Sequence, residues 1–532
     1  MSGRTILPPD RPPEQLPLDP GRGKDSVHRR LTLNSISNTA RLLISLVVAF
    51  FLTPFVVHRL GDAAYGFWVV VLSFVGYAGL LELGVQPAVV RMVGFHRGAS
   101  DARRLSEVVS TALVFFAGVG LLAALVLAFV VPPLVPRLIN DYQGFPALRM
   151  VMLLMAADVL ILYLNYLFTG VLYGWQLYHA KNLIDVAVLL INAAILVAFL
   201  SPGGLVIVAG SKALTDLLAL VATITLCRRV LPQVAFAPWR VGPRSLRELL
   251  GFGGRLFLSA SAARIADHAQ PLIISSQASA AATAHYAIPL RLVDYTRQIA
   301  WSLSTPFMPM FSELDGQRDE QMIRSIYLRY SRYILFLTLP IVGLIFVYGR
   351  AFIAQWIGPV YAQQGGTALY LLAGGVLAHG LQPLIWRLFI GVGRLNFLVI
   401  VSVSTSLGVV LLGFLLVGPL GISGVALSVL VTAWISQVIL FVHTSRYLGV
   451  SVGRQFIEVQ ARPLLIGAVF TGLAALIAGF LGSASYGQMA AGVGLAGILY
   501  GPMLYVGLHA AERKELKRIL RDRIKRGPRA VE

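Results

Sequence analysis

The chain has 532 residues, of which 57% are hydrophobic and 13% are charged. A soluble protein carries about 25% charged residues, so this composition excludes one or two soluble domains and predicts an all-α polytopic membrane protein. The formal net charge is +20, and the single cysteine, Cys227, excludes an intrachain disulfide and a cysteine metal cluster.

The chain opens with a polar arm and continues with apolar segments. Residues 1–30 are rich in proline and charge, which predicts a disordered arm. About fourteen apolar segments follow, each near the length of roughly 20 residues that crosses a bilayer as a helix. They cover residues 34–58, 64–90, 107–131, 147–172, 180–200, 204–227, 252–275, 283–311, 330–349, 366–390, 395–417, 421–444, 461–482 and 487–510. Charged residues dilute the seventh and eighth of these segments.

Arginine and lysine alternate between the connecting loops. With a cytoplasmic N-terminus, the outside loops hold only Arg59, Arg137, Arg149 and Arg350, and the inside loops hold many more basic residues. A bias of this kind marks cytoplasmic loops. It predicts an even number of spans with both termini in the cytoplasm.

Two pairs of short stretches recur at the same separation in the chain. GDAAYGFWVV around Tyr65 matches ATAHYAIPLR around Tyr286, and LFTG at 167–170 matches LFIG at 388–391, both with an offset of 221 residues. This predicts two parallel six-helix lobes, as in transporters whose halves move about a central site. The expected division is an arm at 1–30, lobes at 31–230 and 231–450, two extra helices at 451–511 and a basic tail at 512–532.

Residues 34–94 carry a family resemblance. The helix at 34–58 begins with polar residues and contains Pro54, the turn Leu60–Gly61 leads to Tyr65–Gly66, and the second helix ends near Leu83–Gly84. This stretch resembles the opening of polysaccharide transport proteins, the oligosaccharide flippases of the multidrug/oligosaccharidyl-lipid/polysaccharide (MOP) exporter superfamily. The resemblance implies a V-shaped fold with a cavity lined by helices 1, 2, 7 and 8. It also implies transport of lipid-linked sugars across the bacterial inner membrane.

Charged residues gather on one face of each of two adjacent segments. At 100° per residue, Arg264, Asp267 and His268 fall within an arc of about 100°, and Arg291, Asp294 and Arg297 within about 120°. Charge at membrane depth is costly and usually functional. The two segments are therefore expected to line a polar cavity.

An anionic pyrophosphate head group requires cationic donors, and the planar guanidinium of arginine suits phosphate. The predicted substrate-binding residues are Arg264, Arg291, Arg297 and Arg41. The predicted coupling or gating residues are Asp267, His268, Asp294 and Glu82. In the competing interpretation, the arginines pair with Asp267 and Asp294 and only tie helices together. The partner of Glu82 stays open between the cavity, Arg41 and Arg91.

A second polar set comprises Asp158, Asn165, Asp185, Lys212 and Asp216. We interpret it as a structural network within the first lobe, with Lys212 and Asp216 paired at a spacing of four residues. Arg387 lies near the end of its segment, where its neighbour is either an acidic residue or the cytoplasmic interface.

The sequence therefore predicts a flippase that translocates a polyprenyl-pyrophosphate-linked oligosaccharide by alternating access for surface polysaccharide assembly. A cation-coupled multidrug exporter and a lipid II flippase remain alternatives; the helix at 34–58 lacks the acidic residue typical of the exporters, whereas Asp267 keeps that option open. Short outside loops and the lack of a nucleotide-binding fingerprint disfavour an enzyme. No catalytic residue, cofactor, metal or nucleic acid is expected. The expected partners are the lipid-linked oligosaccharide, the bilayer and a polysaccharide polymerase or glycosyltransferases.

Overall fold

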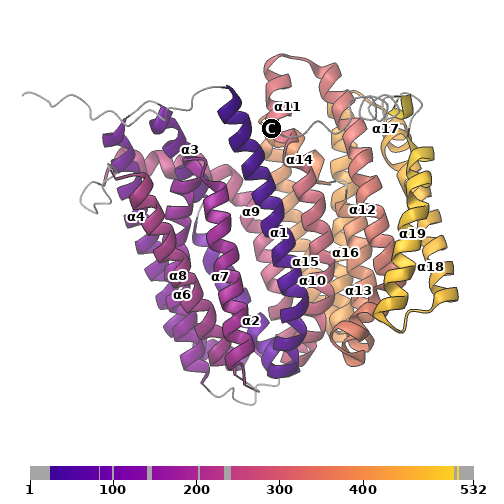
Figure 1. The fold of residues 1–532 in the computed structure, drawn as a ribbon, viewed down its shortest axis with the longest axis horizontal. Helices are drawn as coiled ribbons and strands as arrows, with labels where there is room; N and C mark the ends of the chain where they lie inside the picture. Colours follow the sequence, from indigo (N-terminus) through magenta and orange to yellow (C-terminus); the bar gives the residue numbers. More distant parts are fainter. Residues whose placement is uncertain are drawn as a thin grey trace, which may run out of the picture. The chain divides into compact units, whose positions relative to one another are not determined.

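The structure is a computed structural model that describes residues 24–82, 84–98, 101–140, 147–201, 204–232, 241–380, 382–508 and 512–514. Regular structure in these ranges is helical (Figure 1). The elements are α1 (Lys24–Leu60), α2 (Asp62–Ala78), the 3₁₀ turn η1 (Gly79–Glu82), α3 (Val85–Gly98), α4 (Ala102–Leu125), the π-helical turn η2 (Val126–Val130), α5 (Val131–Leu138), α6 (Leu148–Gly174), α7 (Tyr178–Phe199), α8 (Leu205–Val230), α9 (Pro243–Gln277), α10 (Ala280–Ser304), α11 (Phe307–Gly316), α12 (Glu320–Trp356), α13 (Pro359–His379), α14 (Gln382–Gly391), α15 (Leu395–Leu420), α16 (Ile422–Tyr447), α17 (Val452–Gln455), the π-helical turn η4 (Phe456–Ala461), α18 (Arg462–Leu481) and α19 (Tyr486–Gly507).

Twelve helical stretches of the described residues are long and apolar enough to cross a membrane. They match twelve of the predicted segments, and the all-α polytopic class is thereby confirmed. The two predicted segments at 252–275 and 283–311 lie in α9 and α10, which are not among the twelve. The total of fourteen spans stays a prediction.

Contacts divide the chain into two units, Met1–Ala284 and His285–Glu532, and the boundary falls within α10. α9, expected as the first helix of the second lobe, lies in the first unit. The lobe boundaries expected from the repeat stay predictions. Residues 1–23 of the predicted arm and 515–532 of the predicted tail lie outside the described residues, and α1 begins at Lys24.

Capping residues mark several helix starts. Asp101 accepts a hydrogen bond from the backbone N–H of Arg104 at 2.9 Å, and Asp319 accepts one from Met322 N–H at 2.9 Å. These carboxylates satisfy N–H groups that have no partner inside the helix. The turn between α1 and α2 places Gly61 at a φ of 78°, a backbone conformation that glycine adopts without steric cost.

The first unit contains a core of aromatic side chains between α4 and α6. The rings of Phe116 and Tyr163 lie 6.2 Å apart, and neither side chain is exposed. The Tyr163 hydroxyl donates a hydrogen bond of 2.6 Å to the carbonyl of Ala78, the last residue of α2. The core therefore also supports the end of α2, where the candidate site lies.

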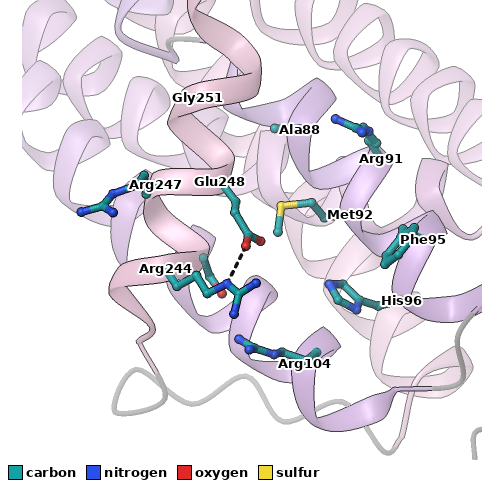
Figure 2. Close-up of a pocket in the computed structure, with 11 residues that line it drawn as sticks. Ala88, Arg91, Met92, Phe95, His96, Arg104, Arg244, Arg247, Glu248 and Gly251 are labelled. Atoms are coloured by element: carbon teal, nitrogen blue, oxygen red, sulfur yellow. Dashed lines mark hydrogen bonds and ion pairs between the residues drawn. The ribbon is translucent and has the colours of Figure 1, made fainter.

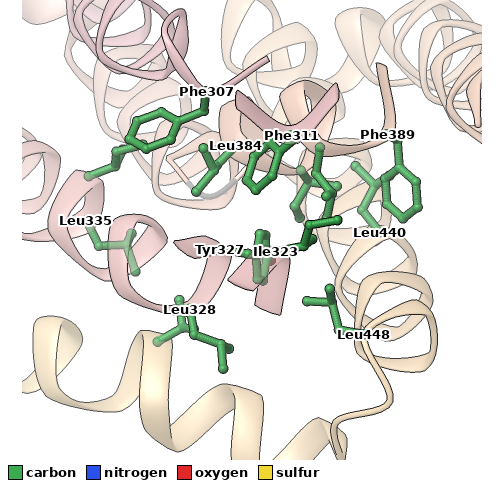
Figure 3. Packing of buried hydrophobic residues seen from close by; sticks show 14 of the residues in the cluster. Phe307, Phe311, Ile323, Tyr327, Leu328, Leu335, Leu384, Phe389, Leu440 and Leu448 are labelled. Carbon is green, nitrogen blue, oxygen red and sulfur yellow. The ribbon is translucent and has the colours of Figure 1, made fainter. Parts of the chain in front are cut away.

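The second unit packs around a larger cluster of buried apolar residues from α10, α11, α12, α14, α15 and α16 (Figure 3). Phe307 of α11 lies against Tyr330 of α12, with ring centroids 4.7 Å apart, and Phe311, Tyr327 and Phe389 belong to the same cluster. The start of the predicted tail belongs to this unit as well, because Arg332 of α12 pairs with Glu512.

The two units use related contacts at the repeated LFTG and LFIG stretches. In the first unit, a Cβ added at Gly170 of α6 would lie 3.1 Å from Val89 of α3. In the second, a Cβ added at Gly391 of α14 would lie 2.8 Å from the carbonyl of Met308 in α11. Each glycine permits close approach of a short helix, α3 in the first unit and α11 in the second.

Candidate functional site

α9 packs antiparallel along α2, and small residues of α2 set the approach. A Cβ added at Gly66 would lie 1.6 Å from the carbonyl oxygen of Ala280, just beyond α9. A Cβ at Gly76 would lie 2.1 Å from the ring of His268. The later residue of α2, Gly76, lies opposite the earlier residue, His268, and Gly66 lies opposite Ala280, as antiparallel packing requires. This pairing brings the charged face of α9 to the end of α2.

Arg264 reaches the end of α2 and its neighbour Glu82. Its guanidinium donates a hydrogen bond of 3.4 Å to the carbonyl of Gly79 and lies 3.8 Å from a carboxylate oxygen of Glu82. The Arg264 side chain is 49% exposed and that of Glu82 is 9% exposed. The other Glu82 oxygen accepts a 3.2 Å hydrogen bond from the backbone N–H of Gln86. The arrangement holds a buried carboxylate in place and leaves part of a guanidinium accessible.

α2 ends at Ala78 and continues as the 3₁₀ turn η1, so carbonyl groups there need hydrogen-bond donors from other helices. The last carbonyls of a helical segment have no donor within that segment. Tyr163 of α6 donates to Ala78, and Arg264 of α9 donates to Gly79. Two elements distant in sequence thus stabilise η1, which presents Glu82.

His268 and Asp267 follow Arg264 on α9. The His268 ring meets the Tyr77 ring edge to face, with centroids 5.8 Å apart. The Tyr77 hydroxyl donates a 3.2 Å hydrogen bond to the carbonyl of Ile265. His268 and Asp267 are both partly buried, so they extend the polar strip along α9.

The second charged group lies on α10, in the second unit. Arg297 pairs with Asp294 at 2.9 Å, and both side chains are about one third exposed, at 33% and 30%. Arg291 is partly exposed on the same helix. The pair of Arg297 and Asp294 lies within one helix, so it does not by itself tie two helices together, as the competing interpretation expects. The structure describes the two charged groups in separate units, so their shared cavity stays a prediction.

Arg41 lies in α1, which packs on α7. Its Nε atom is buried and has no hydrogen-bond partner among the described residues. Ser37 and Asn38 lie one turn before Arg41 on α1. They accept hydrogen bonds from Asn182 of α7 at 3.0 Å and 2.7 Å, respectively. The start of the first span is thus polar on the side that faces α7.

Four members of the polar set, on α6 and α8, form a network, and Asp185 of α7 pairs elsewhere. Lys212 of α8 pairs with Asp216 at 2.6 Å, which confirms the predicted pair, and with the fully buried Asp158 of α6 at 2.7 Å. Asn165 donates to the carbonyl of Asp216 at 3.2 Å, whereas Asp185 pairs with Lys181. The contact between Lys212 and Asp158 joins α8 to α6. Spacing along one helix could not predict this contact, because the two residues lie on different helices.

Arg387 of α14 binds hydroxyl groups and an aromatic ring. Its guanidinium donates hydrogen bonds to Ser304 at 3.3 Å and Thr305 at 3.4 Å, and lies 5.3 Å from the centre of the Trp301 ring. These contacts tie α14 to the end of α10. They give Arg387 a positioning role within the second unit.

The fold and the charged helices define a polytopic helical membrane protein with the fold of the MOP superfamily. The lipid II flippase MurJ in its inward closed conformation matches with a TM-score of 0.69 at 12% identity, over 89% of this chain and 99% of that one. An inward-facing multidrug resistance MATE family transporter of the MOP superfamily matches with a TM-score of 0.63 at 16% identity, over 77% of this chain and 98% of that one. At such identities, these likenesses establish the fold alone.

Family membership comes from the sequence. A family model described as "Polysaccharide biosynthesis protein" matches residues 56–364, which is more than half of the chain. The chain belongs to this family, as its N-terminal stretch predicts. A Shigella flexneri protein named as an O-antigen transporter is 20% identical over 415 residues, which cover 76% of this chain and 94% of that protein.

Proposed function

We propose that the protein is a flippase that moves a polyprenyl-pyrophosphate-linked oligosaccharide across the bacterial inner membrane by alternating access. The observation that carries this proposal is the half-exposed guanidinium of Arg264, held beside the buried Glu82. An arginine within a helical membrane protein faces water, a polar partner or a ligand, because lipid cannot solvate it. Membership of the polysaccharide biosynthesis family supports a saccharide as the cargo.

The ion pair suggests how cargo and coupling interact. The distance of 3.8 Å between Arg264 and Glu82 exceeds the roughly 2.7–2.9 Å of a charge-assisted hydrogen bond, so the guanidinium retains binding capacity. A diphosphate would compete with Glu82 for Arg264. The released carboxylate would then take up a proton or another cation, which couples binding to ion movement.

The other predicted residues take roles around this pair. Arg291, Arg297 and Arg41 would provide further donors for the diphosphate, and Asp267, His268 and Asp294 would adjust the charge of the cavity during transport. The protein forms and breaks no covalent bond in this proposal, so it acts as a transporter and not as an enzyme. Its termini lie in the cytoplasm, where glycosyltransferases supply the cargo, and a polysaccharide polymerase consumes it on the other side.

Deleting the gene from a bacterium separates this function from the alternatives. The deletion should abolish surface polysaccharide and cause lipid-linked oligosaccharide to accumulate in the inner leaflet, with drug sensitivity unchanged. The wild-type gene should restore the polysaccharide, and Arg264→Gln should not. Arg103→Gln, at an exposed arginine on α4, serves as the matched control and should restore it.

Two other outcomes of the deletion would indicate a different cargo. Intact polysaccharide with raised sensitivity to cationic drugs would indicate a multidrug exporter. Growth arrest with accumulated lipid II would indicate a lipid II flippase. Either result would contradict the oligosaccharide assignment.

A further inference from the structure

A cavity in the first unit lies apart from the α2–α9 site. It has a volume of about 640 Å³ and is lined by α3, the start of α4 and the start of α9 (Figure 2). Its charged lining residues are Arg91, Arg104, Arg244, Arg247 and Glu248. We call this cavity the basic pocket.

The basic pocket carries more positive than negative charge. Arg244 pairs with Glu248 at 3.0 Å, and Arg104 pairs with Glu107 at 3.1 Å. Four of the lining residues are arginines and one, Glu248, is a carboxylate. Figure 2 shows Arg244 and Arg104 extending from α9 and α4 toward the same region, with Glu248 directed to Arg244. An anion that binds here would meet an excess of guanidinium donors.

The walls of the basic pocket are fixed by hydrogen bonds between α9 and α4. Ser245, which is buried, donates a 2.8 Å hydrogen bond to Glu107. The backbone N–H of Gly242 donates to Thr111 at 3.1 Å, and a Cβ at Gly242 would lie only 1.9 Å from Glu107. The start of α9 is thus anchored on α4, so the arginines of both helices are brought together before any ligand binds.

The wall that α3 contributes carries apolar side chains beside Arg91 and His96. Ala88, Met92 and Phe95 of α3 line it, and Phe95 is 71% exposed. The candidate span that ends at Glu82 precedes α3, and the next span begins at Ala102. The basic pocket therefore lies where two spans leave the bilayer, with cationic and apolar walls side by side.

We propose that the basic pocket binds the phosphate group of an anionic membrane lipid at the predicted cytoplasmic surface. The arginines bind the phosphate, which they recognise with parallel hydrogen bonds, and the apolar wall of α3 contacts the start of the acyl chains. Free phosphate is also an anion, but it has no acyl chain to contact Met92 and Phe95 and should therefore bind more weakly than the lipid. This inference does not rest on the transport proposal.

The test uses the purified full chain in a non-ionic detergent. Dioctanoyl phosphatidylglycerol, dioctanoyl phosphatidylcholine and inorganic diphosphate are titrated separately, and binding is followed by thermophoresis. Phosphatidylglycerol should bind most tightly. In the double variant Arg244→Gln/Arg247→Gln its Kd should rise about tenfold, because charge-assisted hydrogen bonds contribute about 1.5–3 kcal/mol and tenfold corresponds to about 1.4 kcal/mol.

Two further variants keep the test independent of folding defects. Arg228→Gln/Arg229→Gln removes two adjacent exposed arginines from the end of α8, outside the basic pocket, and should leave the Kd unchanged. Glu248→Gln removes the carboxylate that competes for Arg244 and should tighten binding. Equal losses in the two double variants would overturn the proposal. Diphosphate or phosphatidylcholine binding as tightly as phosphatidylglycerol would also overturn it, since the first needs no lipid and the second no net charge.

Discussion

The sequence predicts the environment of Arg264 only in part. Its position on one face with Asp267 and His268 predicts a polar strip, and the structure places that face against the end of α2. Its partner Glu82 was not predictable, because pairing across distant helices depends on how α2 and α9 pack. Spacing along one helix indicates only local pairs such as Lys212 and Asp216.

At the same scale, Lys212 is expected to stabilise the first unit. It neutralises the buried Asp158 and its helix neighbour Asp216, so Lys212→Met leaves two carboxylates facing one another. Breaking a buried ion pair from one side costs about 3–5 kcal/mol. We expect a lower Tm for Lys212→Met in a thermal unfolding scan of the detergent-purified protein.

The double variant Asp158→Asn/Lys212→Met is the matched comparison. It removes the uncompensated charge at the fully buried position, so it should recover part of the lost Tm. A single variant with the Tm of the wild type would show that the network contributes no stability.

At the scale of elements, apolar run length predicts the twelve spanning helices because the bilayer requires about 20 apolar residues per span. It does not predict which helices pack together. The repeat suggests that α9 starts the second lobe, whereas its described contacts are with α2, α3, α4 and α5. α2 closely approaches His268 of α9 at Gly76 and Ala280 at the start of α10 at Gly66, and a glycine in a sequence does not reveal what lies opposite it.

The close approach of α2 to the start of α10 predicts a strong effect of Gly66→Ala. The new Cβ would lie 1.6 Å from the Ala280 carbonyl, and backbone atoms cannot rotate away as a side chain can. Overpacking of this kind costs typically about 1–3 kcal/mol. The Tm of Gly66→Ala should therefore fall below that of the wild type.

Gly118→Ala is the control for this prediction. Gly118 lies within α4, and an added Cβ would meet nothing within 4 Å. Alanine is favoured over glycine inside a helix by roughly 0.5–1 kcal/mol, so the Tm should stay level or rise. An equal fall in both variants would contradict close packing at Gly66.

At the scale of the whole molecule, the charge of the loops predicts the topology. Cys227 is the only cysteine and is buried, so introduced cysteines can be labelled selectively. Ser201→Cys lies in a predicted outside loop, and Gly453→Cys in a predicted cytoplasmic one; both positions are exposed. In intact cells, a membrane-impermeant maleimide should label the first and spare the second.

Permeabilised cells provide the control, because both cysteines should then react. Labelling of both positions in intact cells, or of Gly453→Cys alone, would contradict the predicted cytoplasmic N-terminus with an even number of spans before residue 453. The same pair of variants also detects the loss of one crossing, at α9 or at α10, since a single missing crossing would move Gly453 to the other side.

The central claim is that Arg264 binds the diphosphate of a lipid-linked oligosaccharide during transbilayer movement. The most direct measurement is the flipping rate of a fluorescent polyprenyl-diphosphate oligosaccharide in liposomes that contain the purified protein. The wild type should flip this lipid, and Arg264→Gln should be slower by roughly ten- to a hundredfold, since a hydrogen bond to a charged group contributes about 1.5–3 kcal/mol. Equal rates for the two proteins, or no flipping by correctly folded wild-type protein, would contradict the account.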